Sequence, residues 1–70
     1  MNADAIEILL NGKPHEVVGG SPLTNLLDEL GMKVGVLIEY NDRALLPKEW
    51  AGVTLSSGDR VEIIRIVAGG

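Results

Sequence analysis

Residues 57–70, SGDRVEIIRIVAGG, place a turn, a strand and a double-glycine ending in direct succession. Ser57-Gly58-Asp59 predicts the turn, and the apolar run that follows predicts a strand over Arg60 to Val67. Because glycine has no Cβ, the final Gly69-Gly70 could enter a space too narrow for any other residue. Such an ending suits a protein whose terminal carboxylate is its reacting group. A frayed end without a function is the alternative interpretation.

The start of the chain predicts a β-hairpin. Ala5 to Leu10 is expected to form the first strand, with Ile6, Ile8 and Leu10 on one face. Asn11-Gly12 predicts a type I′ turn, which needs a positive φ at both central residues. Lys13 to Val18 is then the return strand. Pro14 has no N–H to donate to a ladder, so we expect this strand at an edge of the sheet.

One helix follows the hairpin. Ser21 is expected as its N-cap and Pro22 as its first helical residue. The helix is short, about ten residues, and therefore needs a sheet to cover. Gly31 is its expected stop. The apolar stripe that would face the sheet is formed by Leu23, Leu26, Leu27 and Leu30.

The middle of the chain predicts further short elements. Val34 to Tyr40 is expected to be a strand, and Asn41-Asp42 a turn that leads into the apolar residues 44–46. Pro47 to Trp50 predicts a single helical turn or a loop, and residues 53–55 a short edge strand.

The order of elements predicts an α+β fold, in which one main helix covers one face of a mixed sheet of four to five strands. Residues 1–70 form one domain. On the opposite face of the last strand, Ile64 and Ile66 would lie beside Glu62. An apolar patch left open on a sheet is a candidate partner-binding surface. Burial of this patch under loops is the other possibility.

Composition excludes several functional classes. The net charge of −4 argues against nucleic-acid binding, which needs a basic surface. The chain has no cysteine, which excludes disulfides and thiolate metal sites and is compatible with a reducing cytosol. Its start carries no basic residue and no long apolar run, so we expect no signal peptide. No apolar stretch approaches the length of a membrane span, and we expect a cytoplasmic protein.

The body of the chain offers no active site of its own. His15 is the only histidine, so no multi-histidine metal site can form, and we expect it to be a solvated strand residue. The serines occupy turn and cap positions, where they bond backbone groups. The carboxylates of Asp28, Glu29 and Glu39 fit the outer faces of a helix and a strand. Gly70 is left as the reacting group, and the reach from Val67 to Gly70 is roughly 13 Å when extended.

Several stretches together resemble the ThiS family, the sulfur carrier proteins of bacterial thiamin biosynthesis, which have the ubiquitin-like β-grasp fold. The resemblance covers nearly the whole chain and is strongest in the Gly-Asp turn, the Pro-x-x-Trp element and the terminal Gly-Gly. The matching stretches are residues 6–12, 23–27, 39–42, 46–50, Leu55, 58–63 and 67–70.

The resemblance implies a division of labour. The first and last strands would be parallel neighbours at the centre of the sheet. A ThiF-like adenylating enzyme would use ATP to convert the Gly70 carboxylate into an acyl adenylate, while Gly69 and Ala68 enter its channel. A sulfur-donating enzyme would yield the thiocarboxylate, and thiazole synthase (ThiG) would consume the sulfur. The chain itself would bind no cofactor and no metal and would not be an enzyme. Residues 1–4 and 67–70 are expected to be flexible.

Three other functions share this tail or this fold. The small subunit of molybdopterin synthase has the same tail chemistry but is usually longer. A ubiquitin-like protein modifier would form isopeptide bonds through the same terminal glycine. A plain interaction module, with an incidental tail, would need neither reaction.

Overall fold

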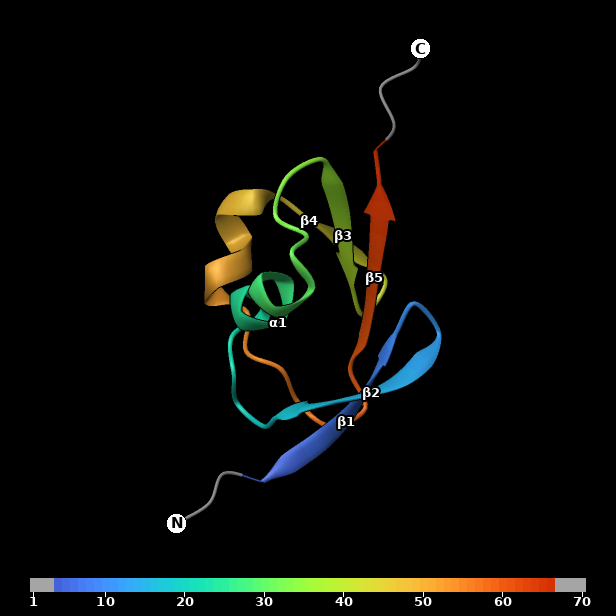
Figure 1. Ribbon diagram of the computed structural model, residues 1–70, viewed down its shortest axis with the longest axis vertical. Coiled ribbons are helices and arrows are strands. Elements are labelled where there is room, and N and C mark those ends of the chain that lie inside the picture. Colours follow the sequence, from blue (N-terminus) through green and yellow to red (C-terminus); the bar gives the residue numbers. More distant parts are fainter. Residues whose placement is uncertain (1–3, 67–70) are drawn as a thin grey trace.

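The computed structural model describes residues 4–66 of the chain, so the expectations for Met1–Ala3 and for Val67–Gly70 lie outside it. Five strands, one α-helix and one 3-10 helix succeed each other (Figure 1). The elements are β1 (Ala5–Leu10), β2 (Lys13–Val18), α1 (Leu23–Leu30), β3 (Val36–Tyr40), β4 (Arg43–Leu45), η1 (Pro47–Gly52) and β5 (Arg60–Arg65).

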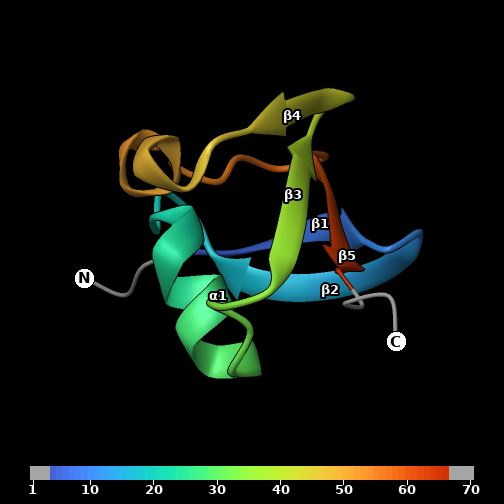
Figure 2. The same cartoon turned by 90° about the horizontal axis from the view of Figure 1, so that it is seen from above.

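All five strands form one mixed sheet in the order β2-β1-β5-β3-β4. β1 and β5 are parallel neighbours, and the other three pairs are antiparallel. Figure 2 shows α1 and η1 on the same side of this sheet. The predicted α+β architecture, with its parallel central pair and Pro14 in an edge strand, is therefore confirmed.

The core lies between α1 and the inner face of the sheet. The predicted leucine stripe is confirmed: Leu23, Leu26 and Leu27 are buried, and Leu30 packs against the same cluster. Burial of these side chains is the main source of stability for so small a domain. The sheet and η1 contribute Ile8, Ile38, Leu45, Trp50, Val61 and Ile63, and the loop after η1 contributes Leu55.

The predicted positive φ values of the Asn11-Gly12 turn are confirmed, and the turn predicted at Asn41-Asp42 has the same kind of backbone. Asn11 and Gly12 have φ values of 51° and 80°, and Asn41 and Asp42 have φ values of 49° and 68°. A turn with two positive φ values has the twist that antiparallel strands require, and Asn, Asp and Gly tolerate it best.

The predicted start of the helix is wrong by one residue. Pro22 has extended backbone (φ −72°, ψ 150°) and occupies the N-cap position, so Leu23 is the first helical residue. Pro22 forms a bridge with Thr54, and this contact holds it outside the helix. The Ser21 hydroxyl donates to the Val18 carbonyl oxygen at 2.6 Å, and no side chain forms a capping hydrogen bond at the start of α1. Gly31 ends the helix in the left-handed region, as predicted.

Two strand boundaries and one predicted strand also differ from the predictions. β3 begins at Val36 because Gly35, with φ of 71°, turns the chain immediately before it. Residues 53–55 do not form a strand, since Thr54 makes only the single bridge to Pro22. β5 ends at Arg65 rather than Val67.

Candidate functional site

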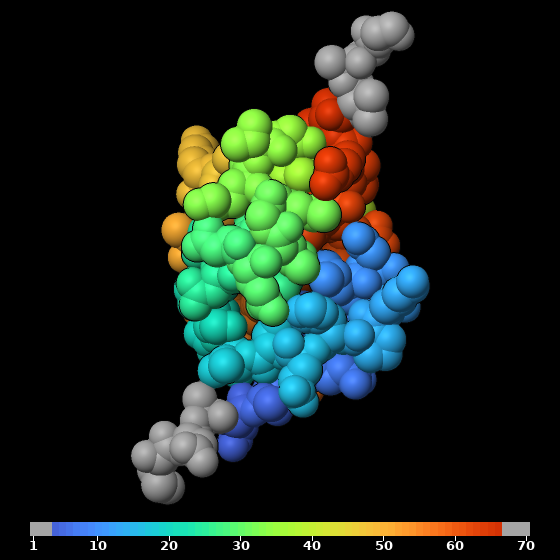
Figure 3. Space-filling view, in the orientation of Figure 1, coloured from blue at the N-terminus to red at the C-terminus, as the bar shows by residue number. Residues whose placement is uncertain are grey.

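The predicted reacting group and its neighbours, Gly70, Gly69 and Ala68, lie outside the residues that the structure describes. The structure does describe β5, the strand that leads toward them. Figure 3 shows atoms of β5 at the surface of the molecule. The geometry of this strand and its supports therefore defines the candidate site.

The two faces of β5 differ in burial. Val61 and Ile63 are buried against the core, whereas Arg60, Glu62 and Ile64 are exposed. Such alternation follows from the period of two along a strand. The inward residues fix the strand to the domain, and the outward residues are free to meet another molecule.

The outward face carries the predicted apolar patch. Ile64 is 43% exposed and Ile66 is 62% exposed, so loops do not bury these two residues. Leu37 of β3 lies directly opposite Ile64 and is 39% exposed. The sequence pattern did not single out Leu37, because only the register of β3 against β5 pairs it with Ile64. Glu39 and Glu62 form the next pair on this face, with Glu39 half-buried and Glu62 exposed.

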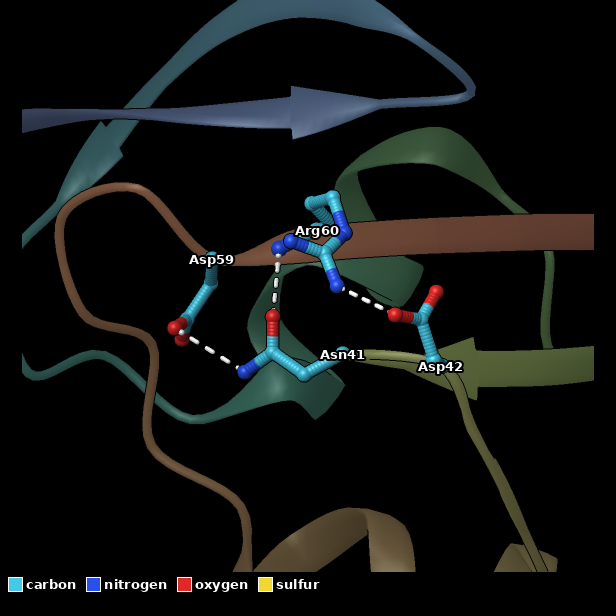
Figure 4. A network of polar contacts seen from close by, with 4 residues as sticks. All are labelled: Asn41, Asp42, Asp59 and Arg60. Carbon is cyan, nitrogen blue, oxygen red and sulfur yellow. Dashed lines mark hydrogen bonds and ion pairs between the residues drawn. The ribbon is translucent and has the colours of Figure 1, made fainter.

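A polar network holds the start of β5 (Figure 4). The buried Asp59 carboxylate accepts hydrogen bonds from the Tyr40 hydroxyl at 2.6 Å, the Ser56 N–H at 2.8 Å and the Asn41 side-chain amide at 3.2 Å. The Asn41 side-chain oxygen in turn accepts from the Arg60 N–H at 2.8 Å. The Arg60 guanidinium also pairs with Asp42. Side chains from the β3–β4 turn thus fix the first residues of β5.

The network changes the ionisation of two of its members. Burial raises the pKa of Asp59, but the hydrogen bonds from Tyr40, Ser56 and Asn41 outweigh it, and the net pKa is lowered from its ordinary value. The hydrogen bond to Asp59, together with burial and the nearby negative charge, raises the pKa of Tyr40 to about 12. At neutral pH the pair is therefore a carboxylate and a neutral phenol, and their hydrogen bond stabilises the turn.

Asn11 holds the middle of β5. Its N–H donates to the Val61 carbonyl oxygen at 2.9 Å, and its side-chain oxygen accepts from the Ile63 N–H at 2.8 Å. The sequence predicted Asn11 only as a turn residue. Its contact with Ile63 spans 52 positions, and nothing in the local pattern could reveal it.

A hollow of about 350 Å³ lies at the end of β5, between the strand and the segment that follows α1. Arg65 and Ile66 line it together with Met32, Val34 and Val36. A second hollow, of about 390 Å³, is lined by residues of β1, β2 and α1 and the segment between β2 and α1, and by none of β5. Of these two hollows, the first is the one that adjoins β5.

Other chemistry is not evident in residues 4–66. No cluster of three or more metal-binding side chains occurs there. His15 lies opposite Ile8, is half-buried, and its Nε2 atom is shielded and has no hydrogen-bond partner in this part of the chain. The expectation of a solvated histidine is therefore wrong for that atom. Among the described helices, none combines the length and apolar character needed to cross a membrane.

Comparison with known proteins decides the family. The model of the ThiS family matches residues 8–70, which is most of the chain. The chain belongs to the ThiS family. It is also 34% identical over 64 residues to the sulfur carrier protein ThiS of Thermus thermophilus, a match that covers 90% of this chain and 98% of that protein.

Solved structures confirm the β-grasp fold of this ThiS family member. The crystal structure of the thiamine biosynthesis protein ThiS from Geobacter metallireducens superimposes with a TM-score of 0.80 and 29% identity. That match covers 93% of this chain and all of the other. A solution structure of a thiamine biosynthesis protein from the same organism gives a TM-score of 0.72 at 30% identity, covering 93% of this chain and 88% of the other.

A larger relative contains a similar segment. The chain is 32% identical over 66 residues to a thiazole synthase of Magnetococcus marinus. This match covers 93% of the chain but only 20% of that protein, so the chain spans about a fifth of this relative's length.

Proposed function

We propose that this ThiS family member is a sulfur carrier protein of thiamin biosynthesis and that Gly70 bears the sulfur as a thiocarboxylate. The observation that carries the proposal is the family match, which extends over residues 8–70 and so includes the double glycine. The curated ThiS of Thermus thermophilus, matched over nearly its whole length, is named as a sulfur carrier.

The chemistry begins with activation of the carboxylate. A carboxylate is a poor electrophile because it has no good leaving group. Attack of a Gly70 carboxylate oxygen on the α-phosphorus of ATP forms an acyl adenylate and releases pyrophosphate. Attack of a sulfur nucleophile on the acyl carbon then releases AMP. When the sulfur comes from a persulfide, reductive cleavage of the resulting acyl disulfide by a thiol frees the thiocarboxylate. A ThiF-like adenylating enzyme supplies the ATP site, and a sulfur-donating enzyme supplies the sulfur.

The role of this chain is to position its tail for the partner enzymes. The Asp59 network and Asn11 fix the strand that precedes it, while Ile64, Ile66 and Leu37 form an exposed apolar surface beside that strand. We assign this surface, with Ala68 and Gly69, to contact with the partner enzymes. The protein is thus a carrier and a substrate rather than an enzyme, and its place of action is the cytoplasm.

Thiazole synthase is the proposed consumer of the sulfur. Support comes from the Magnetococcus marinus protein of that name, which contains a segment similar to 93% of this chain. A carrier and an acceptor that occur in one polypeptide are expected to act on the same intermediate. Here the carrier would meet thiazole synthase as a separate partner or a fused one.

An intact-mass measurement tests the proposal. The chain is incubated with the adenylating enzyme, ATP and a sulfur donor, and replacement of one oxygen by sulfur at Gly70 is expected. A matched variant that lacks Gly70 should show no replacement. Absence of the sulfur adduct on the native chain would overturn the proposal, and isopeptide conjugates in place of thiocarboxylate would identify a protein modifier.

A further inference from the structure

The ladder between β1 and β5 covers only the first two residues of β5. The paired residues are only Leu9 with Arg60 and Leu10 with Val61. Beyond them the hairpin turns away, and Asn11 closes the ladder with its side-chain bond to the Ile63 N–H. Figure 1 shows the remaining part of β5 with β3 on one side and no strand on the other.

The alternation of hydrogen bonds shows which backbone groups face this open side. The Asn41 N–H donates to the Arg60 carbonyl oxygen, and the Ile66 N–H donates to the Gly35 carbonyl oxygen, each at 2.8 Å. The even-numbered residues of β5 therefore bond to β3, and the odd-numbered residues direct their backbone groups away from it. The hydrogen bonds of Asn11 agree with this alternation, because they join it to Val61 and Ile63, which are both odd-numbered.

Three backbone groups in a row are left open. They are the carbonyl oxygen of Ile63, then the N–H and the carbonyl oxygen of Arg65. Within residues 4–66, none of them has a hydrogen-bond partner. We call this row the β5 edge. A row of acceptor, donor and acceptor at strand spacing is complementary to one more extended backbone.

We propose that the β5 edge binds an extended segment of the adenylating enzyme that acts on Gly70. This inference rests on the proposed function. An enzyme whose active site holds Gly70 lies close to this edge, because the five residues that follow Arg65, up to Gly70, span roughly 17 Å when extended. The β5 edge thus leads directly into the segment of the chain that the enzyme must bind.

The side chains beside the edge define the segment that fits. Ile64 and its partner Leu37 offer apolar surface on the outer face. Arg65 points to the opposite face, where it lines the hollow with Met32 and Val36, and it has no ion pair within the described part of the chain. A segment with an apolar residue on the outer face and an acidic residue on the inner face would match both.

The other two edges of the sheet are less suited to such pairing. β2 carries Pro14, which has no N–H, and Lys13. β4 is only three residues long. Proline, lysine and short length are the usual protections of an edge strand. The β5 edge has no proline and no lysine, which favours a specific occupant.

Amide hydrogen exchange tests the pairing on the native chain. In the free protein, the Arg65 N–H should exchange faster than the neighbouring Ile64 N–H, which is bonded to β3. With the adenylating enzyme and ATP present, Arg65 should become protected by about tenfold or more, as expected for a new hydrogen bond. Unchanged exchange at Arg65 while the Gly70 adenylate forms would overturn this inference and leave the proposed function standing.

The remaining outcomes are also decisive. Absence of both protection and adenylate would overturn the inference and the chemistry together. Protection without adenylate would support the docking edge and overturn the chemistry at Gly70. Protection that appears in the free chain with rising concentration, together with a dimer in sedimentation, would assign the edge to a second copy and overturn the enzyme as its occupant.

Two substitutions of Arg65 distinguish the role of its backbone N–H from the role of its side chain. Arg65→Pro removes the N–H on the open edge and leaves the ladder with β3 intact, because that ladder uses the even-numbered residues. Arg65→Ala keeps the N–H and removes only the guanidinium. We expect Arg65→Pro to raise the KM of the adenylating enzyme for the carrier by about tenfold with kcat nearly unchanged, and Arg65→Ala to raise it less. Equal effects of the two variants, with both folded, would overturn the use of the backbone edge.

Discussion

The Tyr40 hydroxyl donates a 2.6 Å hydrogen bond to the Oδ2 atom of Asp59, which also accepts from the Ser56 N–H at 2.8 Å. Tyr40 ends β3, and Asp59 immediately precedes β5. The bond therefore ties the end of one strand to the start of the strand that leads toward the proposed reacting group. The stability of this connection can be measured separately from the chemistry at Gly70.

Removal of the Asp59 carboxylate should destabilise the fold. Asp59→Ala leaves the Tyr40 hydroxyl, the Ser56 N–H and the Asn41 amide without their acceptor, and we expect a loss of about 3 kcal/mol in the free energy of unfolding. Urea denaturation measures it. Asp42→Asn is the control, because it keeps a residue that tolerates the positive φ of this turn and removes only the charge of an exposed ion pair with Arg60, and it should cost about 0.5 kcal/mol or less. Similar losses for the two variants would contradict this role for the network.

The same pair predicts a loss of stability at alkaline pH. Folding raises the pKa of Tyr40 from 10.0 to about 12, so the folded state favours the neutral phenol. Its stabilisation is complete below pH 10 and is lost as the pH rises toward 12. Chemical denaturation across this window should show the decline. Tyr40→Phe should be less stable at neutral pH and should lack this component of the decline.

Asp59 predicts the opposite dependence at acidic pH. Its folded pKa lies below the ordinary value of 3.8, so the folded state favours the carboxylate. The stabilisation is present above that value and is lost as the pH falls through the lower, folded pKa. Acid denaturation of the native chain and of Asp59→Asn checks this, because the variant should lose less stability over the acidic range. Superimposable acid profiles would count against it.

The side chain of Asn11 can be tested without disturbing its turn. Asn11→Gly keeps the positive φ but removes the acceptor for the Ile63 N–H, and we expect a loss of about 1 kcal/mol. Asn11→Asp retains an acceptor oxygen at the same position and should cost less. Urea denaturation compares them, with hydrogen exchange at Ile63 as a local reporter. Faster exchange at Ile63 should appear in the glycine variant alone.

The apolar patch should affect partner binding rather than folding. Ile64→Asp places a charge on a side chain that is 43% exposed, so we expect weaker binding to the adenylating enzyme, by about tenfold, with little change in melting temperature. Val18→Asp is the control, since Val18 is a 51% exposed residue of β2, away from β5 in the sheet order. Calorimetric titration of both variants measures the effect. Equal weakening by the two substitutions would exclude a specific role for the patch.

Local signals in the sequence predicted much of the fold. The leucines of α1, the Asn11-Gly12 turn and Pro14 each act through short-range constraints, namely helical spacing, positive φ and the missing N–H. Boundaries were less predictable. Ser21 is a typical N-cap residue, but the bridge between Pro22 and Thr54 moved the helix start to Leu23. Gly35 likewise shortened β3, because its left-handed backbone ends the extended run before Val36.

The sequence by itself determined the first hairpin, the helix and the last strand, the absence of cysteine and the double glycine at residues 69–70. These features depend only on residue type and on spacing along the chain, so they can be identified without the fold. The tertiary structure alone decided that Asn11 meets Ile63, that Tyr40 meets Asp59 and that the odd-numbered backbone groups at the end of β5 remain open. Such contacts join residues far apart in the sequence, and they exist only once the register of the sheet is set.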